Sequence, residues 1–408
     1  MPGGPPQALP SAESAPTPIE PGAGPIPGAP VDSGALSSSQ GGAAAMTGIE
    51  NKTAVALLLP LSGPSAPLGR AMLDAAQMAL FDVADDRFAL VPRDTQGTPA
   101  GAARAANQAI ALGAKLILGP LLMPEVEAVK PIARAANVNV VAFSTAVQLA
   151  GDGVYLMSFL PKQQVDRVVT VAHDKGASRF AALVPSTPYG QLVVDELRAA
   201  TATMGASVDR VELYDPAARD PSGSVRRLAG HGPTRAAARG QPQPAAATAP
   251  DAPFDALLLP EGGGRLKEMA ALLPYFDIDT EKVHLLGTGV WDEPGLGTEP
   301  ALVGGWFAAP PPEARADFEQ RFQTLFKRRP PRLATLGYDA GALAALLARS
   351  NGFSSSTLEN PSGFSGVDGI FRFGPDGLVQ RGLAVLQVTK TGTSVVAPAP
   401  ETFEELGY

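Results

Sequence analysis

The chain of 408 residues carries 32 Lys and Arg against 40 Asp and Glu, a net charge of −8, and 45% of its residues are hydrophobic. This mildly acidic balance, spread along the chain, argues against nucleic acid as a partner. Cysteine is absent, which excludes disulfides, thiolate metal sites, a cysteine nucleophile and an acylated lipoprotein cysteine from this sequence.

Residues 1–51 form a tract rich in Pro, Gly, Ala and Ser that has few large apolar side chains to offset its chain entropy. We expect a disordered tether here. Its first residues lack the charged and apolar regions of a recognisable signal peptide. Two interpretations remain open: a tether that follows a membrane anchor lost through a misplaced start, or an ordinary flexible tail.

Short apolar strands alternate with Ala-rich helical patterns between residues 53 and 145. Strands without polar alternation are buried on both faces, so this pattern predicts a parallel sheet between helices. Ligands meet such sheets at the carboxyl ends of the strands. The predicted strands are 54–59, 88–92, 115–118 and 138–142, and the predicted helices are 68–81, 99–112 and 124–136. The polar residues at those strand ends are Ser62, Ser65, Asp94, Thr95, Ser144 and Thr145.

The alternation continues to residue 286 and is interrupted once. The segment 215–252 is rich in Ala, Pro, Arg and Gly and lacks periodicity apart from a helix-like start at 224–228, so we expect a mobile surface insertion. The predicted strands are 154–159, 180–185, 208–214, 254–260 and 283–286, and the predicted helices are 162–175, 191–204 and 265–273.

The end of the chain changes character. Helices are predicted at 313–328 and 335–349, followed by two strand segments, 369–378 and 382–388, joined by a Pro375-Asp376-Gly377 turn. That turn chemistry favours an antiparallel hairpin. The fold class predicted is therefore α/β, with doubly wound parallel sheets and an antiparallel hairpin near the C-terminus.

Several motifs, in order, resemble the type I periplasmic solute-binding proteins, in particular the leucine/isoleucine/valine-binding group. They are Leu59-Pro60-Leu61-Ser62-Gly63, Asp94-Thr95, Leu118-Gly119-Pro120, Tyr338-Asp339-Ala340 and the final Gly-Ile-Phe-Arg-Phe-Gly-Pro-Asp-Gly. The resemblance covers residues 52–398 and implies two lobes joined by hinge strands, with a ligand cleft between them. It places lobe 1 at 52–157 and 287–350, lobe 2 at 158–286 and 351–398, and a tail at 399–408.

The sequence departs from the amino-acid binders at the positions that the resemblance assigns to the ligand. Their carboxylate-binding serine corresponds to Met123, a poor hydrogen-bonding partner, while their threonine matches Thr145. Their aromatic wall falls at 258–261, where no aromatic residue stands. Their ammonium-binding acid falls at Gly289, with Asp292 the nearest carboxylate. An unpaired ammonium in a closed cleft is costly, so free amino acids are doubtful ligands.

A narrower resemblance, to the penicillin-binding-protein activators, is carried by the segments 285–292, 302–307 and 259–262. It implies a non-catalytic, periplasmic and outer-membrane-associated module that contacts a peptidoglycan synthase, a penicillin-binding protein. The alternative is a receptor that delivers a small polar ligand to the permease of an ABC transporter.

The candidate cleft residues each have a plainer interpretation. A Trp such as Trp291 is more often core packing than a ligand platform, Asp292 fits a turn before Glu293-Pro294, and Asp94 fits an Asx turn. The serines and Thr145 fit turn chemistry, and Tyr189 fits a loop anchor. The full candidate set is Ser62, Ser65, Asp94, Met123, Ser144, Thr145, Tyr189, Glu261, Trp291 and Asp292.

No enzymatic motif is visible. The three histidines, at 173, 231 and 284, lie far apart without metal-ligand spacing, and no serine stands in a Gly-x-Ser-x-Gly elbow. The glycine-rich stretch 261–265 follows a strand and opens a helix, a context for phosphate binding. It lacks the Gly-Lys-Ser/Thr of a P-loop, and Lys267 stands where a dinucleotide fingerprint needs Gly or Ala. We therefore expect no catalysis, no metal and no cofactor.

Overall fold

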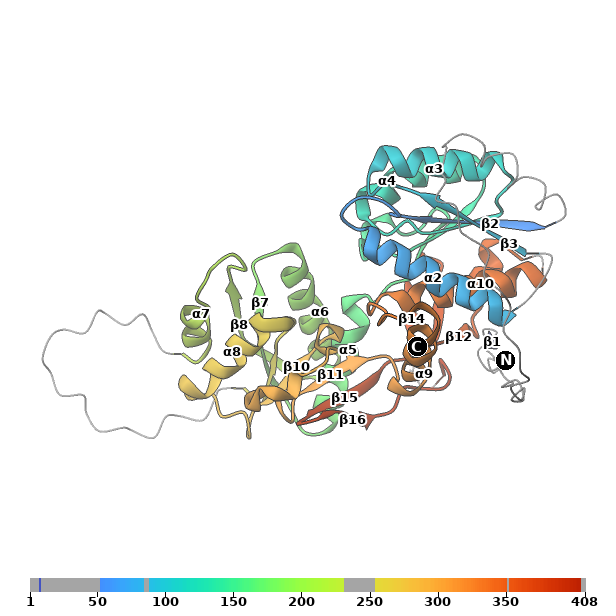
Figure 1. Cartoon of the computed structure of the whole chain (residues 1–408). Helices are drawn as coiled ribbons and strands as arrows, with labels where there is room; N and C mark the ends of the chain where they lie inside the picture. Colours follow the sequence, from blue (N-terminus) through green and yellow to red (C-terminus); the bar gives the residue numbers. More distant parts are fainter. Residues whose placement is uncertain (1–6, 9–51, 84–87, 231–253, 351, 405–408) are drawn as a thin grey trace, which may run out of the picture. The chain divides into compact units, whose positions relative to one another are not determined.

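The computed structural model describes residues 7–8, 52–83, 88–230, 254–350 and 352–404 (Figure 1). The chain divides into two compact units. Unit 1 comprises Met1–Ser158, Arg315–Asp368 and Arg372–Val379, and unit 2 comprises Phe159–Ala314, Gly369–Phe371 and Gln380–Tyr408.

Unit 1 is built on a five-stranded sheet with the order β3-β2-β4-β5-β6, in which every pairing is parallel. Its first strand, β2, which lies second in this order, runs Ala-Val-Ala-Leu-Leu-Leu from residue 54, and all six side chains are buried because helices cover both faces. The strands are β2 (Thr53–Leu59), β3 (Phe88–Asp94), β4 (Leu116–Leu118), β5 (Asn139–Ala142) and β6 (Val154–Leu156).

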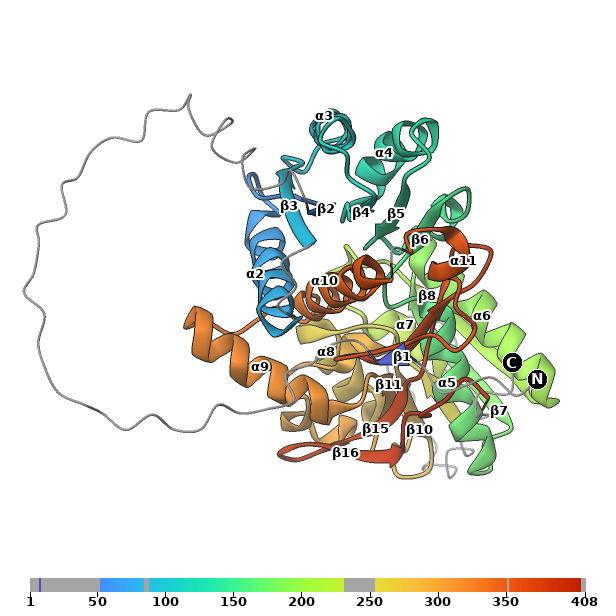
Figure 2. The same ribbon diagram turned by 90° about the vertical axis from the view of Figure 1, so that its right-hand side faces the viewer.

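Two helix pairs cover the faces of this sheet. Helices α3 (Pro99–Ala111) and α4 (Met123–Ala135) pack together on one face, and α2 (Ala66–Val83) and α10 (Ala334–Arg349) pack together on the other (Figure 1). Small residues allow the second pair to approach closely, since a Cβ on Gly337 would lie 2.3 Å from the Met72 carbonyl oxygen. Helix α9 (Pro312–Phe326) lies next to α2 and α10 (Figure 2).

Unit 2 has a seven-stranded sheet with the order β16-β15-β11-β10-β9-β7-β8. The five strands from β8 to β11 are parallel, and β15 joins β11 and β16 in antiparallel pairings. The strands are β7 (Arg179–Pro185), β8 (Ser207–Tyr214), β9 (Ala256–Leu258), β10 (His284–Gly287), β11 (Trp306–Ala309), β15 (Ala384–Thr389) and β16 (Gly392–Ala397).

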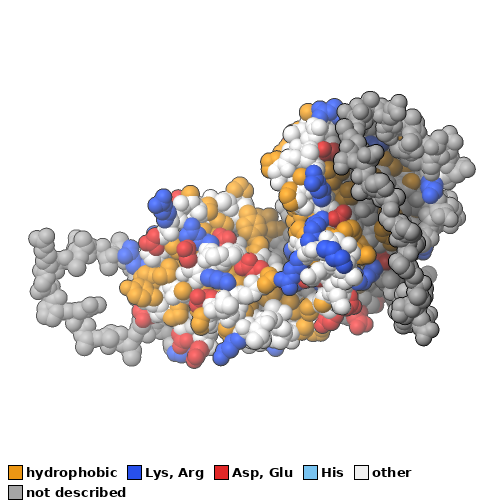
Figure 3. All heavy atoms as spheres, in the orientation of Figure 1, with side chains coloured by type: hydrophobic (Ala, Val, Ile, Leu, Met, Phe, Trp, Pro, Cys, Tyr) orange, Lys and Arg blue, Asp and Glu red, His pale blue; other side chains and the backbone are white. Residues whose placement is uncertain are grey.

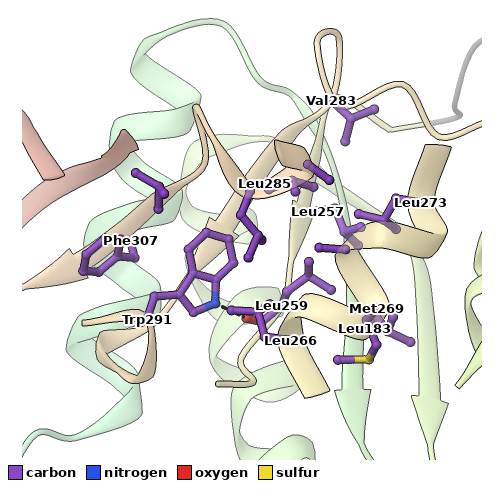
Figure 4. Close-up of a cluster of buried hydrophobic side chains, with 14 of the residues drawn as sticks. Leu183, Leu257, Leu259, Leu266, Met269, Leu273, Val283, Leu285, Trp291 and Phe307 are labelled. Atoms are coloured by element: carbon purple, nitrogen blue, oxygen red, sulfur yellow. Dashed lines mark hydrogen bonds between the residues drawn. The ribbon is translucent and has the colours of Figure 1, made fainter. Parts of the chain in front are cut away.

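The unit 2 sheet separates two hydrophobic cores, because successive side chains of each strand point to opposite faces. Ala256 and Leu258 of β9 lie in the core under α5 (Pro161–Asp174) and α6 (Pro188–Met204). Leu257 and Leu259 lie in the other core, with α7 (Ser222–Leu228) and α8 (Gly263–Tyr275). Figure 4 shows this second core.

Among the described helices, none combines the length and the apolar character that crossing a membrane requires.

The α/β class, the two parallel sheets and the antiparallel C-terminal strands confirm the predicted fold class. The hairpin differs in detail. The Pro375-Asp376-Gly377 turn connects β13 (Gly369–Phe373) to the short β14 (Val379–Arg381), in a four-stranded sheet with the order β1-β12-β13-β14. The segment predicted as the second arm, 382–388, instead joins the unit 2 sheet as β15. The two further strands of the small sheet are β1 (Gln7–Ala8) and β12 (Phe364–Gly366).

The predicted lobe boundaries differ from the two units. Residues 287–314 were predicted to belong to lobe 1. They lie in unit 2, because β11, which falls within this range, pairs with β10 and β15. Residues 351–368 were predicted to belong to lobe 2 and lie in unit 1. A short apolar strand does not encode which sheet it joins. Within the predicted insertion 215–252, α7 buries Val225 and Leu228 in a core. The remainder, from residue 231, lies outside the described residues, as does the predicted tether apart from β1.

Candidate functional site at the carboxyl ends of the two sheets

The strand order reverses once in each unit. In unit 1 the first strand, β2, lies between β3 and β4, and in unit 2 the first strand, β7, lies between β8 and β9. In open α/β sheets the crevice beyond the carboxyl ends at such a reversal is where ligands bind. The residues that follow these strands therefore define a strand-end face on each unit: 60–65, 94–97, 119–125 and 143–146 in unit 1, and 186–190, 259–264 and 287–293 in unit 2.

Asp94 organises the strand-end face of unit 1. Its Oδ1 accepts hydrogen bonds from the backbone N–H groups of Leu61 (2.9 Å), Ser62 (3.3 Å) and Gln96 (2.7 Å), and its Oδ2 accepts from the Ser62 hydroxyl at 2.7 Å. Partial burial acts to raise the pKa of Asp94, but these hydrogen bonds outweigh it and the pKa lies below its ordinary value. Asp94 thus closes the loop after β2 onto the loop after β3.

Glu125 is a second carboxylate on this face, and sequence analysis missed it. It lies in the first turn of α4, is fully buried, and accepts from the Leu122 N–H at 3.1 Å. Burial raises its pKa and the nearby Asp94 charge adds to the rise, while the Thr95 hydroxyl and the N–H groups of Leu122 and Leu121 act in the opposite direction. The sequence signal was available, because Glu at the third helical position commonly caps its own helix.

The other unit 1 candidates lie around this pair. Ser65 is half-buried and immediately precedes α2, and Thr145 is exposed after β5. The hydroxyl of Ser144 is buried and accepts from the Ala146 N–H at 3.2 Å, which is turn chemistry. Met123 is the first residue of α4 and is 42% exposed. Its sulfur accepts from Gln148 Nε2 at 3.4 Å, so an apolar side chain stands at this helix N-terminus.

On the strand-end face of unit 2, Tyr189 contacts the loop after β10. Its hydroxyl lies 3.3 Å from the Thr288 hydroxyl, and burial raises its pKa. The next residue, Gly289, donates its N–H to Gln164 Oε1 at 2.6 Å. Gln164 is buried and its amide donates to the Phe159 carbonyl at 3.0 Å. Sequence analysis missed both Thr288 and Gln164, since neither carries a local signal.

Glu261 and Glu293 occupy the start of α8, where the glycine-rich stretch suggested an anion site. Glu261 accepts from the Tyr214 hydroxyl through Oε2 and from its neighbour Gly262 N–H at 3.1 Å. Glu293 accepts from the Gly263 N–H at 2.8 Å. Burial, followed by the hydrogen bond to Glu261 and its negative charge, raises the pKa of Tyr214. The helix N-terminus that would attract a phosphate is already filled by two carboxylates of the chain.

Trp291 follows β10 in the chain, but its side chain points into the core of unit 2. It is 1% exposed, its Nε1 donates to the Leu259 carbonyl at 2.9 Å, and its ring packs among the apolar side chains beneath the sheet (Figure 4). Gly287 and Gly305 make room for the indole. A Cβ on Gly287 would lie 2.2 Å from the ring, and a Cβ on Gly305 would lie 2.8 Å from it. This burial fits the plainer interpretation of Trp291, as a residue that packs in the core. Asp292 is half-buried at the end of the short helix that carries Trp291, and its N–H bonds to the Gly289 carbonyl.

Both faces share one electrostatic feature: carboxylates of the chain accept hydrogen bonds from N–H groups there. Asp94 and Glu125 occupy donors in unit 1, and Glu261 and Glu293 occupy donors in unit 2. A free carboxylate that approached these donors would meet a carboxylate of the chain. Within the described part of the chain, no group of three or more His, Asp or Glu side chains is arranged to hold a metal ion.

The sequence that forms this geometry matches a known protein family. The family described as "periplasmic binding protein" matches residues 52–393, most of the chain. The chain belongs to the periplasmic binding protein family. A curated relative, the uncharacterized protein RP748 of Rickettsia prowazekii (strain Madrid E), is 24% identical over 161 residues. That match spans 40% of this chain and 43% of the relative's length.

Solved periplasmic binding proteins share the fold. A putative branched-chain amino acid ABC transporter protein from Rhodospirillum rubrum is 18% identical, with a TM-score of 0.71 over 85% of this chain and all of that one (100%). The leucine-binding protein LivK from Thermotoga maritima is 20% identical, with a TM-score of 0.58 over 85% and 98%. Full-length LpoA from Haemophilus influenzae is 17% identical, with a TM-score of 0.64 over 85% of this chain and 59% of LpoA. At these identities the likeness shows the fold alone.

Proposed function

We propose that this periplasmic binding protein is a non-catalytic, extracytoplasmic module of the penicillin-binding-protein activator type, which regulates peptidoglycan synthesis by contacting a synthase. The observation that carries the proposal is the filling of the strand-end donors by Asp94, Glu125, Glu261 and Glu293. A receptor for amino acids needs open donors for the ligand carboxylate, because a buried unpaired charge is costly. A regulator that works through protein contact has no such need.

Two further observations support this choice over an amino-acid receptor. Met123 places a thioether at the N-terminus of α4, where the amino-acid binders carry a hydroxyl, and Trp291 is part of the core and not a wall for a ligand. The segments 285–292 and 302–307 resemble the activators, and full-length LpoA has the same fold. Residues 1–51 would act as a tether that lets the module reach its partner through the cell-wall mesh, from the periplasm or the outer membrane.

The second candidate is a solute receptor for the permease of an ABC transporter. It is favoured by the family match and by the fold shared with the proteins from R. rubrum and T. maritima. The partly exposed Tyr189 and the nearby Thr288 could bind a small polar solute through their hydroxyls. In that case the candidate cleft residues Ser62, Ser65, Ser144, Thr145 and Asp292 would contribute polar contacts, and the ligand would be neutral or cationic.

The two candidates are separated by binding measurements on the whole chain. Surface plasmon resonance with the bifunctional penicillin-binding protein encoded in the same genome should give saturable binding. A thermal-shift screen with leucine, other amino acids, short peptides and sugars should leave the melting temperature unchanged, since only a ligand of the folded state raises it. A saturable shift with one solute, together with no synthase binding, would replace the regulator by the transport receptor.

A further inference from the structure

Unit 1 exposes two large apolar side chains on neighbouring helices. Phe81, near the end of α2, is 81% exposed, and Leu325, near the end of α9, is 58% exposed. Single exposed apolar residues are common on protein surfaces. These two differ because ion pairs hold the two helices together around them.

Two ion pairs set the register of α9 along α2. Arg321 binds both carboxylate oxygens of Asp82 at 2.6 and 2.5 Å, and Arg328 binds Asp74. The start of the segment 321–328 pairs with the end of the segment 74–82, and its end pairs with the start. The two segments therefore run antiparallel. Phe81 is next to Asp82, and Leu325 stands one turn after Arg321 on the same side of α9. Each exposed apolar residue is thus close along its helix to a residue of the Asp82–Arg321 ion pair.

Packed and hydrogen-bonded side chains lie beneath this pair. Phe318 and Phe322 of α9 are buried, and Phe318 meets the Tyr338 ring of α10 edge-on with centroids 5.7 Å apart. The Tyr338 hydroxyl donates to Asp82 at 2.7 Å, and the Arg328 guanidinium lies 5.3 Å from the Phe322 ring centroid. A packed support of this kind needs little ordering when a partner binds above it, which favours the surface for binding.

The segment 321–329 is basic, although the chain as a whole is acidic. The segments 74–82 and 321–329 together carry four cations against two carboxylates, whereas the whole chain has a net charge of −8. Asp74 and Asp82 are both paired, while Lys327 and Arg329 are exposed and make no ion pair with another described residue. Figure 3 shows that Lys and Arg side chains gather on the face of unit 1 that carries α2. The surplus positive charge suits an acidic partner.

We propose that this α2–α9 surface, defined by Phe81, Leu325, Lys327 and Arg329, docks an acidic amphipathic segment of the penicillin-binding protein. The inference rests on the proposed function and names the contact surface for it. Apolar side chains of the partner cover Phe81 and Leu325, and its carboxylates pair with Lys327 and Arg329. The apolar anchors determine how long the complex lasts, and the cations at the rim speed association.

The test uses two double variants of the full chain in the same binding assay. Phe81→Ser with Leu325→Ser should weaken synthase binding at least about tenfold through faster dissociation. Lys327→Glu with Arg329→Glu should slow association and reduce its dependence on salt. The matched control is Tyr275→Ser, because Tyr275 is an aromatic residue of similar exposure (77%) that belongs to unit 2. It should bind like the wild type.

The outcomes separate this inference from the proposed function. If the wild type fails to bind the synthase, the proposed function itself is lost. If the wild type binds and both double variants bind equally well, the regulator stands and the α2–α9 surface is wrong. Light scattering measures the oligomeric state of the same proteins. If the wild type is a dimer and the double serine variant is a monomer, the surface binds a second copy of this chain. That result would overturn the proposal. All variants should melt like the wild type, because the changed side chains are exposed.

Discussion

Replacing Gly287 by Ala should destabilise unit 2, although the change adds one methyl group. The new Cβ would lie 2.2, 2.4 and 2.5 Å from the Cδ2, Cε2 and Cγ atoms of Trp291. The indole cannot retreat freely, since its Nε1 bonds to the Leu259 carbonyl and Gly305 lines its other side. Overpacking of this kind costs about 1–3 kcal/mol. The melting temperature of a unit of this size should fall by roughly 2–12 °C.

Tryptophan fluorescence reports this change selectively. The chain has two tryptophans, Trp291 and Trp306, and both lie in unit 2. Urea unfolding followed by fluorescence therefore measures the free energy of unfolding of this unit. The matched control is Gly264→Ala, because that glycine lies in α8 and a methyl group added to it would have no neighbour within 4 Å. It should be neutral or stabilising by up to about 1 kcal/mol.

A double variant tests the cause of the loss. Trp291→Leu alone should destabilise unit 2 through the cavity it leaves, and Gly287→Ala added to it should cost about 1–2 kcal/mol less than in the wild-type background. The reasoning about Trp291 fails if Gly287→Ala unfolds within about 0.5 kcal/mol of the wild type, or if the two substitutions are additive.

Three further predictions concern the strand-end carboxylates. Glu125→Gln should stabilise unit 1 relative to the wild type, and increasingly so as pH rises. The folded-state pKa of Glu125 is raised, so the stability that its protonated form gives to the wild type is complete below the ordinary Glu pKa and is lost as pH rises through the folded pKa. Calorimetry that finds the same pH dependence of stability in both proteins contradicts this. Asp94→Asn should speed hydrogen exchange of the Ser62 amide about tenfold at neutral pH, because it removes a charged acceptor from that N–H. The difference should shrink only at low pH, where Asp94 of the wild type becomes protonated, since its folded-state pKa is lowered. Equal exchange rates in the two proteins at neutral pH would refute the prediction. Tyr214→Phe should cost unit 2 about 1–3 kcal/mol by removing a donor to Glu261, whereas Tyr275→Phe, at an exposed site, should be silent in the same fluorescence assay.

The candidate site divides into residues that sequence located and residues that it did not. Strand ends are visible as polar breaks after apolar runs, so Ser62, Asp94, Tyr189 and Glu261 were predicted near them. The structure places Ser62 and Glu261 in loops, Asp94 at the end of β3 and Tyr189 in the first turn of α6. Their partners were not visible. Asp94 bonds to Ser62 across 32 residues of sequence, and Tyr189 meets Thr288 across 99. Whether a polar side chain is open to a ligand or satisfied within the chain depends on such distant partners.

The motif that resembled the activators shows the same limit. The residues around Gly287, Trp291 and Gly305 were noted as a pattern, and the structure gives them a shared packing role in the core of unit 2. No local rule distinguishes a tryptophan that packs inward from one that lines a cleft, because burial is a property of the assembled sheet and helices.

The sequence by itself determined the class of fold and the order of most strands and helices, because the period of the apolar pattern and the turn residues are local properties. It did not predict the strands β11, β12 and β16. Tertiary structure alone decided which sheet accepts β11, where unit 1 resumes after residue 314, and which donors Asp94, Glu125, Glu261 and Glu293 occupy. These outcomes depend on strand pairing and hydrogen bonding between residues far apart in the chain. Such contacts form only when the chain is folded, and no spacing along the sequence specifies them.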